Sequence, residues 1–191
     1  MEQSDKKTLK PNVRAIAYIG VFAAAICITA PWSISIGPIP LSLATLTIYI
    51  AGSILPAKYS FAAVLVYILL GTVGLPVFSG FQGGLQKLVS VTGGYIVGYL
   101  PCVLITGLLL KNRHDKIYMY PIAMLCGTVV LYALGTAWFV YSSSKGLGYA
   151  LSVCVTPFIA GDLIKIAIAT LIAFTVRRRL IKSSDGIISE K

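Results

Sequence analysis

Long apolar runs, each closed by proline, glycine or charged residues, make up most of the chain. Backbone N–H and C=O groups inside a lipid bilayer find no water to bond, so such runs satisfy them best as helices. A helix needs roughly 20 mostly apolar residues to cross a bilayer. The second and third runs are shorter, and we expect them to tilt little or to end below the membrane surface. The six predicted helices cover residues 13–30, 41–55, 60–73, 94–110, 117–141 and 155–174.

The composition favours a membrane protein over a soluble one. The 191 residues are 57% apolar and 12% charged, with a mean hydropathy of +0.87, whereas a soluble domain contains about 25% charged residues. Six crossings would use about 120 residues, which leaves too few for a fused ATPase, an extramembrane enzyme domain or a multi-domain receptor. We therefore predict an all-α integral membrane protein with six transmembrane helices, built as a single membrane domain over residues 1–191.

Lysine and arginine are distributed unevenly between the two ends of the predicted bundle. Thirteen of the 16 lie on the side that holds both termini, whereas Lys87 and Lys145 lie on the other side and Lys165 lies within the last run. Short cytoplasmic connections carry the excess of positive charge in membrane proteins, so both termini should be cytoplasmic. The net charge of +10 is spread between hydrophobic runs and forms no solvated basic face. We therefore expect the lipid bilayer, and no nucleic acid, as a partner.

Cysteine and histidine give no sign of a metal or redox centre. The four cysteines, Cys27, Cys102, Cys126 and Cys154, fall inside apolar stretches and are too far apart for a C-x-x-C motif. His114, the single histidine, stands among charged residues of a connection. We predict packing roles for the cysteines, and neither a metal site nor a cofactor.

One pair of opposite charges lies inside a predicted membrane helix. Asp162 and Lys165 are three positions apart, which places both side chains on one helix face with the acid in the favourable N-terminal position. Each charge costs about 2.5–3.5 kcal/mol at the bilayer centre on insertion scales. The pair is either a structural ion pair between two helices or a site for a ligand with N–H donors and a carboxylate. In the second case Asp162 accepts from the donors, while Lys165 binds the carboxylate or keeps Asp162 ionised.

A glycine-rich connection follows the third run on the side away from the positive charge. It contains residues 71–84 and, further on, Thr92-Gly93-Gly94-Tyr95, with Phe78, Phe81 and Tyr95 as apolar walls. The chain contains no G-x-x-x-x-G-K-[ST] string, so ATP hydrolysis by that route is excluded. Because glycine permits tight turns, the composition is compatible with both a flexible loop and a lid over a ligand.

The first predicted helix carries a stripe of small residues, Ala17, Gly20 and Ala24. Small residues at this spacing let two helices approach closely in lipid. The stripe predicts either a contact within the bundle or a contact with a partner.

Four strings in the chain occur together in one known family. They are Gly37-Pro38-Ile39-Pro40, Gly74-Leu75-Pro76-Val77-Phe78, Thr92-Gly93-Gly94-Tyr95 with Gly98, and Pro157-Phe158 with Gly161-Asp162 and Lys165. With these strings the chain resembles the BioY family, the biotin-specific substrate-binding subunits of energy-coupling-factor (ECF) transporters. Biotin suits the polar pair, because it carries a ureido ring with two N–H donors, an apolar fused ring and a carboxylate tail.

The resemblance implies a six-helix subunit in the cell membrane of a prokaryote that captures biotin from outside. Its partners would be a transmembrane coupling protein, the T component, and two ABC-type ATPases, with the stripe on the first helix docking the coupling protein. The residues expected to bind biotin are Asp162, Lys165, Tyr95, Phe78, Ser79, Gln82, Ser90 and Lys87.

Two other functions would use the polar pair differently. A proton-coupled small-molecule carrier would use Asp162 as a proton relay, although such carriers usually contain an internal repeat that is absent from this sequence. A membrane-embedded enzyme would use Asp162 as its base, but no nucleophile, histidine or second carboxylate is placed to share the work. We therefore expect a binding subunit and not an enzyme.

Overall fold

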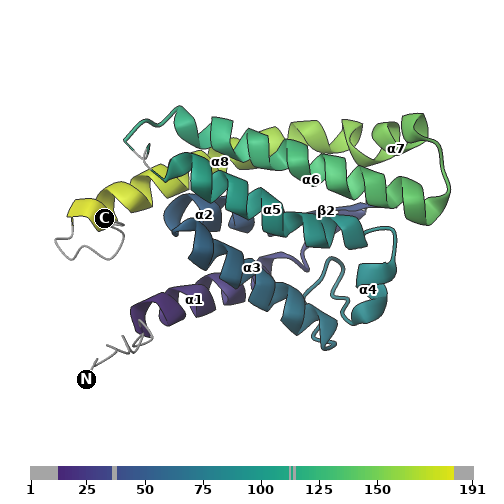
Figure 1. Cartoon of the computed structure of the whole chain (residues 1–191), viewed down its shortest axis with the longest axis horizontal. Helices are drawn as coiled ribbons and strands as arrows, with labels where there is room; N and C mark the ends of the chain where they lie inside the picture. Colours follow the sequence, from purple (N-terminus) through teal and green to yellow (C-terminus); the bar gives the residue numbers. More distant parts are fainter. Residues whose placement is uncertain (1–12, 36–37, 112, 114, 183–191) are drawn as a thin grey trace, which may run out of the picture.

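Helices account for most of the residues described in the computed structural model, which are 13–35, 38–111, 113 and 115–182. The predictions for the charges before residue 13, for Gly37, for His114 and for the tail after residue 182 concern residues outside these ranges. The elements (Figure 1) are, in chain order, α1 (Val13–Thr29), β1 (Ser33–Ser35), β2 (Pro40–Ser42), α2 (Ala44–Ile54), α3 (Ala57–Thr72), α4 (Leu85–Val89), α5 (Gly93–Leu110), α6 (Met119–Ser143), α7 (Leu147–Cys154) and α8 (Thr156–Lys182).

Three helical segments in the described part of the chain are long and apolar enough to cross a bilayer. They are α5, α6 and the α7–α8 segment Leu147–Arg179. Helices α1, α2 and α3 are also apolar but shorter, with 17, 11 and 16 residues. The described chain is therefore that of a mostly helical membrane protein.

The predicted second helix begins later than its apolar pattern indicates, because its first residues form a strand. Strands β1 and β2 pair antiparallel. The pairing continues beyond them, since the Leu43 N–H donates to the Trp32 carbonyl at 3.1 Å. The Ser42 Oγ then accepts from the Ala44 N–H at 3.0 Å. Residues 41–43 are thus part of the hairpin, and α2 begins at Ala44.

Two connections that the sequence predicts as loops contain short helices. Helix α4 lies within the glycine-rich connection, and α7 lies within the connection before the last helix. Helix α6 ends where Ser144 adopts the left-handed conformation with φ 54°, and α7 begins directly after Gly146. The last helix also continues well beyond its predicted end at residue 174.

Glycine brings α5 and α6 into close contact. A Cβ atom on Gly94 would lie 2.2 Å from the Cβ of Trp138, and one on Gly135 would lie 2.4 Å from the ring of Tyr95. No larger residue fits either position without movement of a helix. Because helices in lipid associate through close packing, these glycines allow α5 to lie along α6 (Figure 1).

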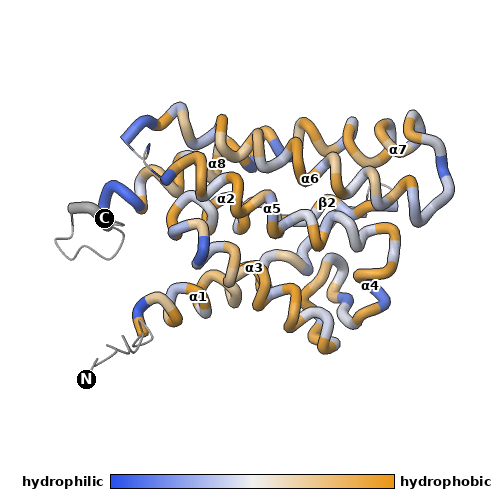
Figure 2. Tube along the Cα trace, in the orientation of Figure 1, coloured by the Kyte–Doolittle hydropathy of each residue, from blue (hydrophilic) through white to orange (hydrophobic). Residues whose placement is uncertain are grey.

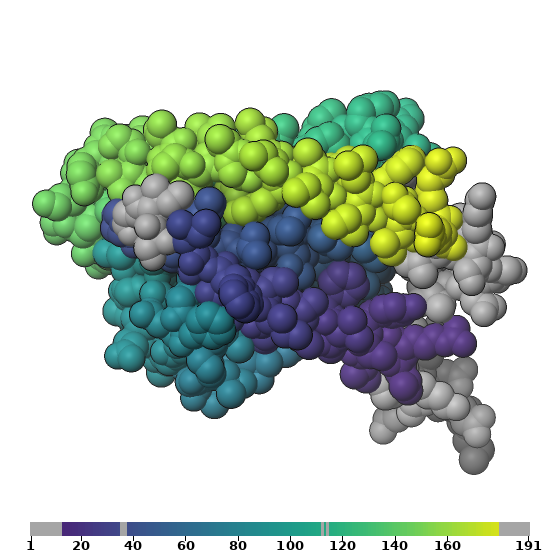
Figure 3. Space-filling model, turned by 180° about the vertical axis from the view of Figure 1, so that it is seen from behind, coloured from purple at the N-terminus to yellow at the C-terminus, as the bar shows by residue number. Residues whose placement is uncertain are grey.

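Helix α2 lies in the middle of the molecule, with nine of its 11 residues buried. It packs against α5 and α8, while α1 packs against α3. In Figure 3, which views the molecule from behind, α1 lies on the surface and α2 is seen between α1 and α8. The short length of α2 is compatible with a membrane protein, because its backbone is enclosed by protein.

Arg177 of α8 binds the C-terminal end of α2. Its Nη1 donates to the carbonyl oxygens of Ser53 at 3.1 Å and Ile54 at 3.0 Å. The last carbonyls of a helix have no partner within the helix, and a cation at this end is favoured by the helix dipole. This contact joins α8 to α2 beyond residue 174, the predicted end of the last helix.

Hydrophilic segments gather at the two ends of the molecule (Figure 2). The beginning of α1, the α2–α3 junction, the α5–α6 connection and the end of α8 lie at one end (Figure 1). Helix α4 and the α6–α7 connection lie at the other end. The two sides of the predicted charge asymmetry therefore correspond to opposite ends of the structure.

Candidate ligand-binding site

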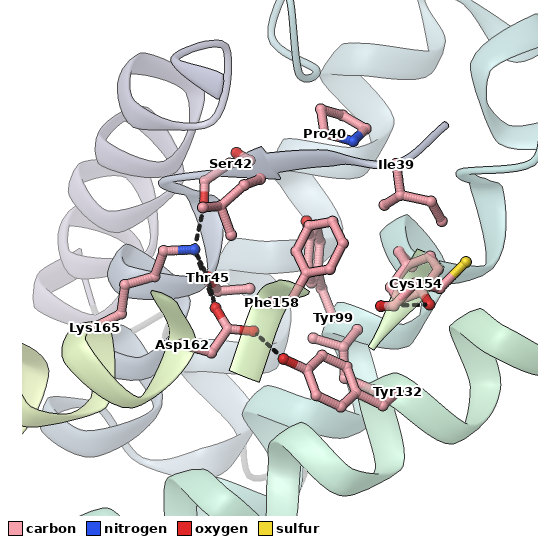
Figure 4. A pocket seen from close by; sticks show the side chains of 13 residues that line it. Ile39, Pro40, Ser42, Thr45, Tyr99, Tyr132, Cys154, Phe158, Asp162 and Lys165 are labelled. Carbon is pink, nitrogen blue, oxygen red and sulfur yellow. Dashed lines mark hydrogen bonds and ion pairs between the residues drawn. The ribbon is translucent and has the colours of Figure 1, made fainter. Parts of the chain in front are cut away.

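A cavity between β2, α2, α5, α6 and the α7–α8 segment contains the buried charge pair (Figure 4). Asp162 and Lys165 expose only 5% and 7% of their surface. The other lining residues are mostly apolar or carry a hydroxyl group. The full lining consists of Ile39, Pro40, Leu41, Ser42, Thr45, Tyr95, Tyr99, Leu131, Tyr132, Cys154, Phe158, Asp162 and Lys165.

The ammonium group of Lys165 uses all three of its N–H bonds within the protein. Its Nζ lies 3.0 Å from Asp162 Oδ1, 2.7 Å from the Ser42 carbonyl oxygen and 3.1 Å from Thr45 Oγ1. A lysine ammonium has three donors and no acceptor. A ligand group can therefore bind Lys165 only by displacing one of these three partners.

The carboxylate of Asp162 retains room for one more donor. Its Oδ1 accepts from Lys165 and, at 3.4 Å, from the Thr45 hydroxyl, while its Oδ2 accepts from the Tyr132 hydroxyl at 2.6 Å. Each carboxylate oxygen accepts about two hydrogen bonds. Oδ1 is thus fully used, and Oδ2 can accept one N–H from a ligand.

Apolar and aromatic groups form the remaining walls. Leu131 and Phe158 line the cavity, and the Tyr95 hydroxyl lies 3.2 Å from Thr136 Oγ1 and 3.5 Å from the Cys154 carbonyl oxygen. A mostly apolar enclosure with a few fixed polar groups is typical of small-molecule sites. Within the described ranges, no three histidine, cysteine or carboxylate side chains come together to hold a metal ion.

Phe78 lies in the core and not in the lining of this cavity, where the sequence prediction placed it. Its side chain has no exposed surface, and its ring packs edge-on against Tyr67 with 5.6 Å between the centroids. A Cβ atom on Gly71 would lie 2.2 Å from this ring. The missing side chain of Gly71 therefore lets Phe78 pack into the bundle.

The other predicted outer residues lie in the connection around α4, outside the cavity lining. Lys87 Nζ donates to the Gln82 side-chain oxygen, and the Ser90 hydroxyl donates to the Lys87 carbonyl at 2.7 Å. Partial burial lowers the pKa of Lys87. Ser79 is half-buried and Gln82 is exposed. Of the eight residues predicted to bind the ligand, the cavity thus brings together Asp162, Lys165 and Tyr95.

Sequence reasoning missed the hydroxyl groups that surround the pair. Ser42 and Thr45 lie at the beginning of a short apolar run, where small polar residues are unremarkable. Tyr132 comes from another helix, and its partner could not be read from the chain. The signal for Tyr99 was available, because it follows Tyr95 by four residues and so shares its helix face.

The stripe of small residues on α1 faces away from the bundle. Ala17, Gly20 and Ala24 are all exposed, and a Cβ atom on Gly20 would meet no atom within 4 Å. Within the described chain the stripe therefore does not serve contact between the helices of the bundle.

A model of the BioY family matches residues 2–182 of the chain. The chain belongs to the BioY family. Among its relatives, the biotin transporter BioY of Thermotoga maritima is 36% identical over 169 residues, which cover 87% of this chain and 97% of that protein. A probable biotin transporter BioY of Pyrococcus horikoshii is 35% identical over 162 residues, covering 85% and 95%.

A solved structure shares the fold of this BioY-family chain. It is the crystal structure of the S-component for biotin from an ECF-type ABC transporter, with a TM-score of 0.80 and 30% sequence identity. The match covers 87% of this chain and 92% of the other. The helices that surround the cavity thus follow the architecture of an S component.

Proposed function

We propose that this chain captures biotin from outside the cell as the substrate-binding subunit of an ECF-type ABC transporter. The observation that carries the proposal is a buried Asp162–Lys165 pair inside an apolar cavity in a chain of the BioY family. Its relatives bear the name biotin transporter, and the similar solved structure is an S-component for biotin. The chain is a transport subunit and not an enzyme.

The polar pair recognises the ureido ring in this proposal. Asp162 Oδ2, which has room for one donor beside Tyr132, accepts a ureido N–H. Lys165 keeps Asp162 ionised through their 3.0 Å contact, and Leu131 and Phe158 contact the apolar fused ring. A hydrogen bond to a charged acceptor is stronger than one between neutral groups, so Asp162 contributes most to affinity.

We expect Asp162→Asn to weaken biotin binding by about tenfold to a hundredfold, since hydrogen bonds to charged groups contribute roughly 1.5–3 kcal/mol. Equilibrium dialysis of labelled biotin against the detergent-purified chain, without ATP, measures this. The matched control is Asp115→Asn, which removes an exposed carboxylate from the α5–α6 connection and should bind as the wild type does. Equal affinity of the two variants would contradict the assigned role of Asp162.

Lys87 binds the carboxylate tail in this proposal. The N–H bonds of Lys165 are already used by three protein acceptors, and a ligand carboxylate beside Asp162 would be repelled. Lys87 lies in the connection around α4 and is bonded to the neutral side chain of Gln82, which a carboxylate can replace.

The Lys87→Ala variant should therefore lose most of the preference for biotin over its neutral amide. Titration of both ligands against the wild type, Lys87→Ala and the control Lys145→Ala measures that preference. Lys145 is also on the outer side but lies in the α6–α7 connection. If the preference persists in Lys87→Ala, the carboxylate has another partner, and Lys165 becomes the first to test.

The chain crosses the cell membrane of a prokaryote six times in this proposal, with both termini in the cytoplasm. Helices α1, α2 and α3 supply three crossings in addition to the three longer segments. The basic residues at the α2–α3 junction, in the α5–α6 connection and at the end of α8 support the orientation. Its relatives come from prokaryotes, among them Thermotoga maritima and Pyrococcus horikoshii.

Single cysteines introduced into a cysteine-free variant should report this orientation. With an impermeant thiol reagent on intact cells, we expect labelling at residues 79, 82 and 143 but not at 113. The first three lie at the end of the molecule that carries α4 and the α6–α7 connection, and Arg113 lies at the opposite end (Figure 1). Labelling of residue 113 from outside would reverse the orientation and the side from which biotin enters.

The partners are a transmembrane coupling protein and two ABC-type ATPases, and the coupling protein docks on α1. Helix association in lipid depends on close packing of small residues. Ala17, Gly20 and Ala24 are exposed on α1, and no atom lies within 4 Å of the Cβ position of Gly20. The lining of the cavity contains no residue of α1, so docking and ligand binding use separate surfaces.

The Gly20→Trp variant should bind biotin normally in isolation, yet fail to copurify with the coupling protein and fail to support uptake. The indole would hold the partner helix away from α1. Gly148→Trp is the matched control, because Gly148 of α7 also has no atom within 4 Å of its Cβ position. A Gly20→Trp chain that still forms the complex would place the docking surface elsewhere.

A further inference from the structure

The hydroxyl groups that line the cavity differ in whether they already form a hydrogen bond within the protein. Among the described residues, Ser42 donates to the Ala30 carbonyl at 2.7 Å. Thr45 and Tyr132 both donate to Asp162, and Tyr95 bonds Thr136 and the Cys154 carbonyl. These four hydroxyl groups are therefore engaged with the protein itself.

Tyr99 is the exception in this lining, since its hydroxyl has no hydrogen-bond partner among the described residues. Its side chain is 8% exposed, and the residue lies on the cavity wall with Asp162 and Phe158 (Figure 4). The hydroxyl is not sealed in the core either. In the described part of the chain, the fully buried side-chain atoms without a partner are Ser53 Oγ and Arg177 Nε. A buried hydroxyl costs free energy when it is unpaired, so this one is available to a ligand.

The cavity thus offers one unused acceptor, at Asp162 Oδ2, and one unused donor, at the Tyr99 hydroxyl. A group that presents N–H and C=O side by side satisfies both. The ureido ring of biotin is such a group, whereas a carboxylate would meet the charge of Asp162 in a medium of low dielectric constant. We infer that Tyr99 determines specificity by donating a hydrogen bond to the ureido oxygen while Asp162 accepts from the ureido N–H. This inference rests on the proposed function and adds a residue to it.

The test compares biotin with an analogue in which sulfur replaces the ureido oxygen, because sulfur is the weaker acceptor. The wild-type chain should prefer biotin, and Tyr99→Phe should reduce that preference about threefold to tenfold, as expected for one hydrogen bond. The control is Tyr49→Phe. Tyr49 is a buried tyrosine whose hydroxyl bonds Thr128 at 2.7 Å and lies outside the lining, so its removal should leave the ligand preference unchanged.

Thermal unfolding without ligand provides the second measurement. Tyr99→Phe removes no hydrogen bond within the protein, so it should unfold at the temperature of the wild type or above, while Tyr49→Phe should unfold earlier. A Tyr99→Phe chain that fails to fold would show that the hydroxyl has a structural role and would overturn the inference.

The remaining outcomes are distinguishable. If Tyr132→Phe loses the preference for biotin over the sulfur analogue and Tyr99→Phe retains it, the donor is Tyr132 and the inference is wrong. If every variant keeps the wild-type ratio of affinities for the two ligands, no tyrosine of the cavity recognises the ureido oxygen, and the inference is wrong. A wild-type chain that binds neither ligand would instead contradict the proposed function, and the role of Tyr99 with it.

Discussion

The ammonium group of Lys165 is the constraint on which the arrangement around the cavity depends. A buried lysine must place each of its three N–H bonds on an acceptor. Here the acceptors come from three different elements, namely Ser42 in β2, Thr45 in α2 and Asp162 in α8. A shift of any one element would leave an N–H unpaired in an apolar surrounding. The contact therefore fixes the beginning of α2 against α8, and the two Arg177 bonds fix the end of α2 against the same helix.

The charge pair could be predicted from the sequence because charge is rare inside an apolar run. Asp162 and Lys165 stand out against their neighbours, and their spacing places them on one face. Hydroxyl groups carry no such signal. The chain has 11 tyrosines, and nothing in the local pattern distinguishes Tyr132, which donates to Asp162, from a tyrosine that merely fills the core. Its role depends on the packing of α6 against α8, which no local rule supplies.

The differences between the sequence predictions and the structure have a common cause, which is contact between segments. Residues 41–43 look like the beginning of an apolar helix, but backbone pairing with the segment that contains β1 makes them part of a hairpin. From the sequence, Phe78 is expected to line a glycine-rich loop. In the structure its ring packs in the core, in the space that a side chain on Gly71 would fill. In both cases the structure depends on an interaction with another segment, and local composition does not predict the position of that segment.

The cavity draws its lining from β2 and the residue before it, α2, α5, α6, α7 and α8, and from none of α1, α3 and α4. The molecule thus has a half that encloses the charge pair and a half that does not. Ser42 is one of the links between the two halves, because its hydroxyl donates to the Ala30 carbonyl just past the end of α1 and its own carbonyl accepts from Lys165. Because the hydroxyl and the carbonyl belong to one residue, α1 is positioned relative to the ligand-binding half without contributing to the lining. In the proposed function, the exposed face of α1 accepts a partner helix without touching the walls of the cavity.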